Sequence, residues 1–335
     1  MYEYIGVCSL YFGFVHGQEQ IIFICFWSNV IMNFGFLNFC NKYYLYFTMG
    51  FFKQFFGNTK LDYKKRYELQ LSAMSGTMSK VYKARDRETG EIVALKILDM
   101  VKTNNILGRF PAGTKKPTEG EIAIQFDHPY IIKTLSHGFT VDNEQYLIME
   151  YLGGSGLNNV LLVQEDLMAG ARLHYIRQVA EAVAAVHEKG FIHRDICPRN
   201  LIFTGDGTVL KLTDFGLTVP DLPPFREPGN RTGTANYMAP ELIRRKTTDR
   251  RLDIFAFGVT IYELCTKNLP WPRGENANAA MAHSAPPEPI TTYRPQINKT
   301  LANAIHKCIE PDTANRLSEI RQFIRMIAKI EHEDE

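Results

Sequence analysis

Polar and apolar residues alternate along 67-YELQLSAMSGTMSKVYKARDRETGEIVALKIL-98. A period of two is typical of strands with one buried face. The turn signal 88-ETGE-91 divides the later part of this stretch, so we predict three strands, of which the last two form a hairpin. Two more stretches of the same kind follow at 135–140 and 145–150. The first half of the folded part is therefore expected to be a small antiparallel sheet.

The pattern changes farther along, where apolar residues recur every three or four positions. This spacing predicts a helix over 171–189, which ends at Gly190 in a left-handed cap. Its apolar positions are Leu173, Ile176, Val179, Ala180, Val183 and Val186. A second, almost wholly apolar segment, 253-DIFAFGVTIYELCT-266, predicts a buried helix. A β-rich half followed by a helical half indicates an α+β fold.

Candidate chemistry lies between these two helices, in 191-FIHRDICPRNLIF-203 and 212-LTDFG-216. A Gly-Asp-Gly turn at 205–207 joins two short apolar runs, which predicts a hairpin. The hairpin would bring Asp195, Asn200 and Asp214 together at the strand ends. Asp195 is placed to orient a hydroxyl and accept its proton, whereas Asn200 and Asp214 offer the hard oxygen ligands that Mg²⁺ prefers. This set of groups suits phosphoryl transfer.

These two segments resemble the catalytic loop, H-R-D-x-x-x-x-N, and the metal-binding loop, D-F-G, of protein kinases. The resemblance implies a bilobal protein-kinase fold with ATP and Mg²⁺ as cofactors. The N-lobe, a small antiparallel β-sheet with one main helix, would span 67–152, and the mostly α-helical C-lobe would span 153–328. The sequence as a whole most resembles compact bacterial-type serine/threonine kinases.

The same resemblance assigns Lys96, in 93-VALK-96, to the α- and β-phosphates of ATP and to an ion pair with a helix glutamate. Glu119 and Glu121 are both candidates. Counting back from 128-HPYII-132, which resembles the family's H-P-N-I segment, favours Glu119. Ile122 and Phe126 would then share the helix face that packs on the sheet. The stretch before this helix, 102–116, is expected to be a flexible connection.

The glycine-rich phosphate loop of the family, G-x-G-x-x-G-x-V, is depleted in this chain. Aligned on Val81, its three glycine positions are Met74, Gly76 and Ser79, so only Gly76 can approach a phosphate without a Cβ. The stretch 149-MEYLGG-154 resembles the hinge between the lobes, with Met149 guarding the back pocket. Further residues are implied around the adenine: backbone groups of Glu150 and Leu152, and the side chains of Val81, Ala94 and Ile202.

A second departure lies two residues after Asp195, where serine/threonine kinases carry a lysine and this chain carries Cys197. A neutral thiol cannot stabilise the transferring phosphate as a cation can. We therefore hypothesise that Arg199 supplies that charge. Two interpretations of Cys197 stay open, an oxidisable thiol and a simple substitution.

The activation segment is expected over 214–241 and closes with Ala239-Pro240-Glu241, the family's A-P-E. Thr234 matches the threonine that serine/threonine kinases keep near the catalytic aspartate. Arg194 is typical of kinases switched by loop phosphorylation, and Thr232 is the candidate site, although it can equally be a plain loop threonine. The four prolines Pro220, Pro223, Pro224 and Pro228 predict an extended, stiff segment.

Two helical residues of the C-lobe are implied to hold this machinery in place. Asp253 would bind the backbone of the catalytic loop, and Arg316 would form a buried pair with Glu241. Cys265 and Cys308 lie in apolar helical patterns and are expected in the core.

Composition adds few constraints. The 335 residues carry a net charge of +2 and contain neither a basic block nor a nucleic-acid-binding motif. Nucleic acid is therefore not expected as a partner, whereas the resemblance implies protein substrates with Ser or Thr. The acidic end, 329–335, is expected to be a solvated tail.

The first 48 residues do not resemble the rest, since Glu3, Glu19 and Lys42 are their only charged residues. One interpretation is a membrane anchor through 21–40, although polar residues interrupt it. We favour a start at Met49, with 1–48 absent from the working protein and 49–66 acting as a leader. A cytoplasmic kinase is then expected, with a membrane-anchored one as the alternative. Peptides from 1–48 in mass spectra of the native source would contradict the late start.

Two rival functions remain at this point. The depleted glycine loop and Cys197 favour a pseudokinase that binds or scaffolds without transferring phosphate, whereas the intact Lys96, Asp195, Asn200 and Asp214 favour an enzyme. A small-molecule kinase on a related fold is the second rival. The complete activation segment favours a peptide substrate over that one.

Overall fold

The protein was examined as a computed structural model that describes residues 11–15, 18–22, 60–75, 79–110, 113–163, 168–228, 230–271 and 283–335. The chain divides into two compact units, Met1–Thr59 and Lys60–Glu335. In the first unit, strands β1 (Tyr11–Val15) and β2 (Gln18–Ile22) form an antiparallel hairpin. Most of the segment 21–40 and the start at Met49 lie outside the described residues. None of the described helices has the length and apolar character needed to cross a membrane.

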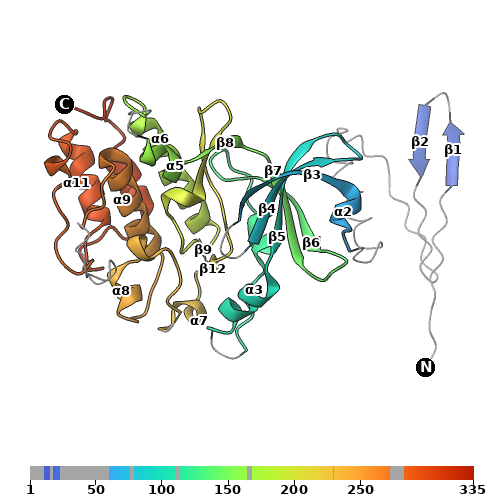
Figure 1. The fold of residues 1–335 in the computed structure, drawn as a ribbon, viewed down its shortest axis with the longest axis horizontal. Coiled ribbons are helices and arrows are strands. Elements are labelled where there is room, and N and C mark those ends of the chain that lie inside the picture. The colour runs from blue at the N-terminus through green and yellow to red at the C-terminus, as the bar shows by residue number, and fades with distance from the viewer. Residues whose placement is uncertain are drawn as a thin grey trace. The chain divides into compact units, whose positions relative to one another are not determined.

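The second unit begins with a five-stranded antiparallel sheet (Figure 1). Its strands lie in the order β3-β4-β5-β7-β6, and they are the five strands that alternation in the sequence predicted. Gly90 closes the β4–β5 hairpin with a φ of +78°, a value that favours glycine. The strand bounds are β3 Tyr67–Ser75, β4 Ser79–Asp86, β5 Ile92–Leu98, β6 Thr134–Phe139 and β7 Gln145–Glu150.

The N-lobe starts earlier than the sequence indicated. A short helix, α2 (Tyr63–Arg66), precedes the sheet and is capped by the carboxylate of Asp62. Leu61 pairs with Thr140 next to strand β6 and packs on the sheet cluster around Leu95. The expected boundary between leader and lobe at residue 67 is therefore too late by several residues.

The link between β5 and the next helix is not the flexible connection that was expected. It contains helix α3 (Met100–Leu107), whose N-terminus is capped by Asp99. The following helix, α4 (Glu119–Ala123), is only five residues long and opens with a capping box between Thr118 and Glu121. Phe126 consequently lies beyond the end of α4, and the prediction that it shares a helix face with Ile122 is wrong.

The C-lobe is mostly helical and contributes most of the largest hydrophobic cluster among the described residues. Helix α6 (Arg172–Glu188) carries its predicted apolar face into this core, and Gly190 follows it with a φ of +77°. Helix α9 (Arg251–Thr266) is buried along almost its entire length, as its composition predicted. Cys265 and Cys308 are both buried in the cluster. Figure 1 shows the helices of this lobe gathered at the end of the unit opposite the sheet.

Short elements complete the C-lobe and carry most of its loops. They are β8 Gly153–Gly156, α5 Leu157–Leu162, β9 Phe191–Ile192, η1 Pro198–Asn200, β10 Leu201–Thr204, β11 Leu210–Leu212, β12 Val219–Pro220, α7 Pro223–Arg226, η2 Ala235–Tyr237, α8 Pro240–Ile243, η3 Ile290–Thr292, α11 Lys299–Cys308 and α12 Ile320–Met326. Strands β10 and β11 form the hairpin predicted around the Gly-Asp-Gly turn.

The acidic C-terminus is not a solvated tail. Glu333 is buried and accepts hydrogen bonds from Arg172 at 2.8 Å, from Arg294 at 2.7 Å and from the backbone N–H of Gly170 at 3.1 Å. Burial would raise the pKa of this carboxyl, but the hydrogen bonds from Arg294, Arg172 and the backbone of Gly170 outweigh burial and lower it. The last residues therefore fasten the chain end to the C-lobe.

Candidate active site

The catalytic loop follows β9 and is held from below by helix α9. The carboxylate of Asp253 accepts hydrogen bonds from the backbone N–H of His193 at 2.7 Å and of Arg194 at 2.8 Å. Arg194 has a φ of +70°, a strained conformation for a residue with a Cβ. The predicted contact between Asp253 and the loop backbone is thus confirmed, and it stabilises a conformation that the loop alone would disfavour.

Both oxygens of the Asp195 carboxylate accept hydrogen bonds. One of its oxygens, Oδ1, accepts hydrogen bonds from the backbone N–H of Thr234 at 2.9 Å and from its hydroxyl at 2.7 Å. The other, Oδ2, accepts from the side-chain amide of Asn200 at 2.9 Å. These contacts fix the orientation of the carboxylate toward the activation segment.

Asn200 and Asp214 are brought together by the β10–β11 hairpin. Thr213 donates from both its N–H, at 2.8 Å, and its hydroxyl, at 3.1 Å, to the backbone carbonyl of Asn200. Asp214 has a φ of +64°, and Gly216 lies so close that a Cβ there would sit 3.2 Å from Asp214 Oδ1 and 3.3 Å from Glu119 Oε2. The loop is therefore folded tightly around the carboxylate of Asp214.

Lys96 forms two ion pairs, one with Glu119 within the N-lobe and one with Asp214 of the C-lobe. Its Nζ lies 2.6 Å from Glu119 Oε1 and 2.9 Å from Asp214 Oδ1. Burial of the Asp214 carboxyl would raise its pKa, but the Lys96 ammonium outweighs burial and lowers this pKa to about 2. Of the two candidate glutamates, Glu119 makes the contact, whereas Glu121 caps its own helix.

The residues implied around an adenine come from strands β4, β5 and β7 of the N-lobe sheet, from the segment after β7 and from β10. Ala94 pairs in register with Met149, and both are buried members of the main cluster. Val81 and Leu152 pack against the same cluster, and Ile202 is half-buried on β10. The remaining predicted residues are Glu150, whose carboxylate accepts from Lys211 Nζ at 2.7 Å, and Gly76, which lies outside the described residues.

Cys197, the residue that departs from the family pattern in the catalytic loop, is buried. Burial raises the pKa of the Cys197 thiol to about 12, which keeps it protonated and disfavours the interpretation as a reactive, oxidisable group. Arg199 lies close by, with Nη2 at 3.2 Å from Thr234 Oγ1 and at 3.6 Å from Asp195 Oδ2. More than half of its side chain is exposed, so its guanidinium is both beside Asp195 and accessible.

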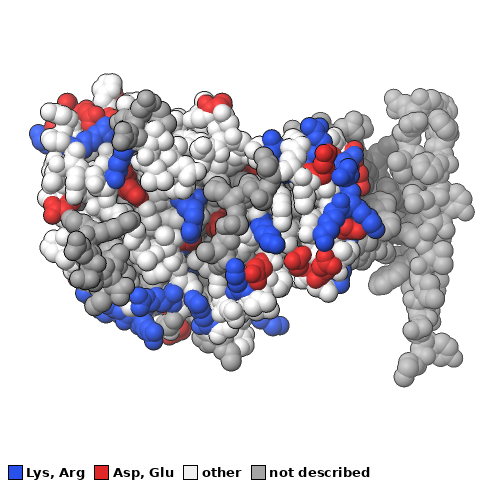
Figure 2. Space-filling model, in the orientation of Figure 1, with Lys and Arg blue, Asp and Glu red and all other residues white. Residues whose placement is uncertain are grey.

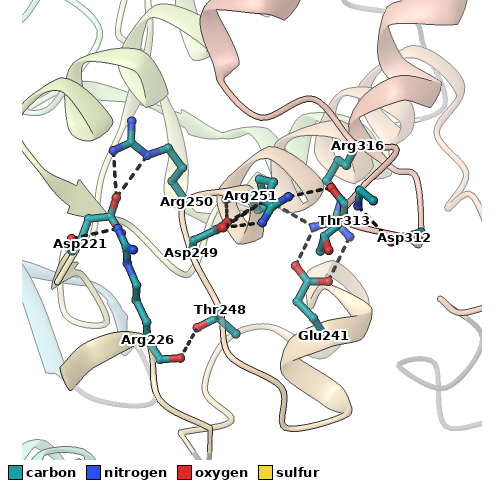
Figure 3. Close-up of polar contacts among 11 residues, drawn as sticks. Asp221, Arg226, Glu241, Thr248, Asp249, Arg250, Arg251, Asp312, Thr313 and Arg316 are labelled. Atoms are coloured by element: carbon teal, nitrogen blue, oxygen red, sulfur yellow. Dashed lines mark hydrogen bonds and ion pairs between the residues drawn. The ribbon is translucent and has the colours of Figure 1, made fainter. Parts of the chain in front are cut away.

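The activation segment is anchored by a polar network that Figure 3 shows in close-up. Asp221 Oδ1 accepts from Arg226 Nε at 2.9 Å, and Asp221 Oδ2 accepts from Arg250 Nη2 at 3.0 Å. The backbone N–H of Thr248 donates to the carbonyl of Arg226 at 2.9 Å. The prolines do not keep the segment extended throughout, because Pro223 occupies the first turn of α7, a position that tolerates proline.

Arg194 lies in a buried polar niche of the same segment. Its Nη2 donates to the carbonyl of Asn230 at 2.6 Å. Within the part of the chain that the structure describes, no hydrogen-bond partner reaches its Nε and Nη1 or the side-chain amide of Asn230. Thr232, two residues after Asn230 in the chain, is also buried. Burial lowers the pKa of the Arg194 guanidinium to about 10, so the niche holds an incompletely compensated cation.

The end of the activation segment is fixed by the predicted buried pair. Arg316 donates from two nitrogens to the two carboxylate oxygens of Glu241, at 2.7 and 3.0 Å (Figure 3). Its guanidinium also lies 4.8 Å from the ring centroid of Phe255. The bidentate geometry holds α8 against the loop that precedes α12.

Two residues that sequence reasoning missed complete the site. Lys116 Nζ donates to the carbonyl of Gly216 at 3.2 Å, and burial lowers the pKa of this lysine to about 8. Phe110 is buried against Ile192, Val219 and Phe225. Lys116 follows Lys115 and carries no pattern that separates it from a solvated charge. Phe110 did give a signal, as the one aromatic residue within 102–116.

Positive charge gathers on the surface beside the activation segment. Figure 2 shows Lys and Arg side chains along the lower edge of the C-lobe, where Figure 1 places α7 and α8. Arg231, Arg244, Arg245 and Lys246 are exposed in this region. This surface, the basic rim, would attract acidic segments of a partner.

Comparisons with known proteins agree with this geometry. The family described as the protein kinase domain matches residues 72–329. A probable serine/threonine-protein kinase of Clostridium perfringens is 33% identical over 272 residues, which cover 79% of this chain and 38% of that protein. The serine/threonine-protein kinase pkn3 of Myxococcus xanthus is 28% identical over 293 residues, or 84% of this chain and 52% of that protein.

An Aurora kinase of Candida glabrata is 31% identical over 261 residues, which cover 78% of this chain and 70% of that protein. The chain thus spans about two-fifths of the clostridial relative and about half of the myxobacterial one. The family match covers most of the chain and includes the catalytic loop, the metal-binding loop and the activation segment. This chain belongs to the protein kinase family.

Proposed function

We propose that the protein transfers the γ-phosphate of ATP to Ser and Thr hydroxyls of protein substrates. Two observations carry this proposal: Thr234 and Asn200 orient the Asp195 carboxylate, and Lys96 forms an ion pair with Asp214. Asp195 would align the acceptor hydroxyl and take its proton as the phosphate transfers. The threonine at position 234 supports Ser/Thr acceptors, and two of the relatives above are named as serine/threonine kinases.

The residues present fit ATP and Mg²⁺. Burial would raise the pKa of Asp214, but Lys96 lowers it to about 2, so the carboxylate stays ionised. Part of this side chain is exposed to solvent. The Asn200 nitrogen donates to Asp195, which leaves the amide oxygen for a cation. Two such ligands together with phosphate oxygens are a common way for proteins to hold Mg²⁺. When bound, the ion would neutralise phosphate charge, while Lys96, fixed by Glu119, would hold the α- and β-phosphates.

The adenine would lie between the lobes. Val81 and Ala94 would cover one face and Ile202 the other, Met149 would limit the depth of the pocket, and backbone groups of Glu150 and Leu152 would bind the ring edge. Gly76 would approach the phosphates. An ATP-dependent enzyme with buried free thiols such as Cys265 and Cys308 fits the cytoplasm.

Arg199→Ala is expected to lower turnover by at least about tenfold, because Arg199 is the cation of the catalytic loop nearest to Asp195. Steady-state rates with a peptide substrate measure the effect. Arg199→Lys is the matched control and should retain most of the activity, since it keeps the charge. An alanine variant as fast as the unmodified protein would exclude this role for Arg199.

Phosphorylation of Thr232 is expected to raise activity, because a phosphate there would find the unpartnered nitrogens of Arg194 in the buried niche. Thr232 is buried, so the segment must open for the modification and close on the phosphate afterwards. Mass spectrometry after incubation with ATP identifies the modified residue, and rates before and after phosphatase treatment measure its effect. Equal rates for the Thr232→Ala variant and the phosphorylated protein would contradict this mode of regulation.

The experiment that tests the function is phosphorylation of a peptide set, followed by identification of the modified residue. Each sequence is presented in three forms, with Ser, Thr or Tyr as the acceptor and with acidic or basic flanks. Ser and Thr acceptors with acidic flanks are expected to react best, because the basic rim lies beside the activation segment. Modification of tyrosine alone, or of sugars and aminoglycosides instead of peptides, would contradict the proposal.

The pseudokinase alternative rests on the depleted glycine loop and Cys197. It predicts that ATP binds and no peptide is modified. The geometry favours the enzyme, because Lys96 is paired with Asp214 and Asn200 donates to Asp195. The backbone N–H of Thr213, the residue before Asp214, donates to the carbonyl of Asn200 and so holds the two pairs on one hairpin.

A further inference from the structure

Helix α4 is too short to determine its own position. It has five residues, whereas isolated helices of fewer than roughly 12 residues are marginal in water. It nevertheless carries Glu119, whose carboxylate holds Lys96 at 2.6 Å. The position of Glu119 must therefore be set by the packing of α4, whose Gly120 lies against His137 of β6, and by the contacts of the segments on both sides of it.

On its C-terminal side, α4 is tied to the metal-binding loop. Phe126 is buried and stacks on Phe215, with ring centroids 4.9 Å apart. Phe215 is the neighbour of Asp214 in the chain. Movement of that loop would therefore displace the residues immediately after α4.

On its N-terminal side, the connection from α3 reaches across to the C-lobe. The ring of Phe110 meets that of Phe225 edge to face, with centroids 5.4 Å apart and an interplanar angle of 74°. Ile192 and Val219 complete this small apolar cluster, and all four side chains are buried. Ile192 immediately precedes the catalytic loop, whereas Val219 and Phe225 belong to the activation segment. We call this group of four residues the Phe110 cluster.

A polar contact reinforces the apolar one. Lys116, three residues before Glu119, donates to the carbonyl of Gly216 at 3.2 Å. The connection is thus attached to the start of the activation segment at Gly216 and again farther along at Phe225. Between these attachments and Glu119 there are few residues in which a displacement could be absorbed.

Phe225 keeps its place in the Phe110 cluster only while the activation segment is ordered. Phe225 lies in α7, which has four residues and is held by the contacts of Arg226 with Asp221 and Thr248. Because so short a helix has little stability of its own, Phe225 leaves its place whenever this part of the segment moves. The apolar side chain of Phe110 would then be exposed to water, which is unfavourable.

We propose that Phe110 is a positioning residue, whose contact with Phe225 makes the position of Glu119 depend on the order of the activation segment. The proposal rests on the proposed kinase function for its effect on turnover, but not for the physical coupling itself. An ordered segment holds Phe110, and Phe110 holds the connection that presents Glu119 to Lys96. A displaced segment releases both.

The test compares Phe110→Ala, Phe225→Ala and the double variant, with Leu107→Ala as the matched control. Leu107 is an apolar residue of the same connection, but it is 37% exposed and lies outside the cluster. Each single variant is expected to lower turnover by about tenfold, and the double variant by little more, because residues acting through one contact are not additive. Leu107→Ala should stay within about twofold of the unmodified protein.

Hydrogen exchange supplies a readout that a merely local packing role would not change. Phe225→Ala is expected to speed amide exchange in 113–123, on the other side of the contact, to the same extent as Phe110→Ala. The apparent melting temperature of each variant is measured in parallel. If Phe110→Ala fails to fold, Phe110→Leu and Phe225→Ala take its place, and the leucine variant should retain most of the protection.

Several results would overturn the proposal. Multiplicative losses of turnover in the double variant would show that the two rings act separately. Unchanged exchange in 113–123 when Phe225 is replaced would show that the segment does not reach α4. Should the unmodified protein transfer no phosphate, the proposed function fails, and the exchange experiment alone still decides for or against the coupling.

Discussion

Asp195→Asn is expected to lower phosphate transfer by roughly 10²–10⁴-fold, the usual contribution of a positioned general base. Asparagine is nearly isosteric and can still accept a hydrogen bond from Thr234 at one oxygen. It cannot accept a proton from a hydroxyl, and it brings an N–H group where Asn200 already donates. The loss should therefore fall on turnover, with little change in structure.

Nucleotide binding provides the control for this variant. The Lys96–Glu119 and Lys96–Asp214 pairs do not involve position 195, so ATP affinity measured by calorimetry should stay within a few-fold of that of the unmodified protein. Transfer at an undiminished rate would show that Asp195 is not the base. Equal loss of binding and transfer would point to a folding defect instead.

Arg316→Met is expected to destabilise the protein by about 3–5 kcal/mol, the usual cost of removing one partner from a buried ion pair. The substitution would strand the Glu241 carboxylate, which is buried and loses both charged hydrogen bonds. It would also leave the carbonyls of Glu310 and Arg251 without their donor. Chemical denaturation gives the free energy of unfolding.

The matched control is Arg325→Met on α12, where the side chain is exposed. This change should cost less than about 1 kcal/mol. The double variant Glu241→Gln, Arg316→Met should lose less than the sum of the single changes, because both remove the same pair. A single Arg316→Met variant as stable as the control would mean that the pair contributes nothing to the fold.

The parts of the site that could be predicted share one property. Each has a side chain with a specific chemical role, and each stands at a characteristic spacing in the sequence from another such residue. Asp195, Asn200 and Asp214 are separated by a short hairpin, so local structure alone brings them together. Lys96 and Glu119 are farther apart in the chain, and the family pattern supplied what spacing could not.

The parts that were missed depend on contacts between distant segments. Glu333 looked like one more solvated acid, because its partners Arg172 and Arg294 are 161 and 39 residues away in the chain. Lys116 gave no signal for the same reason. The length of α4 was overestimated because the apolar spacing continues to Phe126, which lies beyond the helix and stacks on Phe215.

The two departures from the family pattern act differently on the proposed function. Cys197 is buried and protonated, so it neither supplies charge nor presents a reactive thiol. The cation it replaces has a candidate substitute in Arg199, which lies beside Asp195. The glycine loop has no such substitute among the residues that the structure describes, and its effect is expected on ATP affinity more than on the transfer step.

Transfer of labelled γ-phosphate from ATP in the presence of Mg²⁺ is the most direct test of whether this chain is an active kinase. The full chain is compared with its Asp195→Asn variant, ATP binding is measured on both, and any modified residue is identified by mass spectrometry. Label on Ser or Thr that disappears in the variant is the expected result. Binding of ATP by both proteins with no transfer by either would contradict the proposed function and establish a pseudokinase.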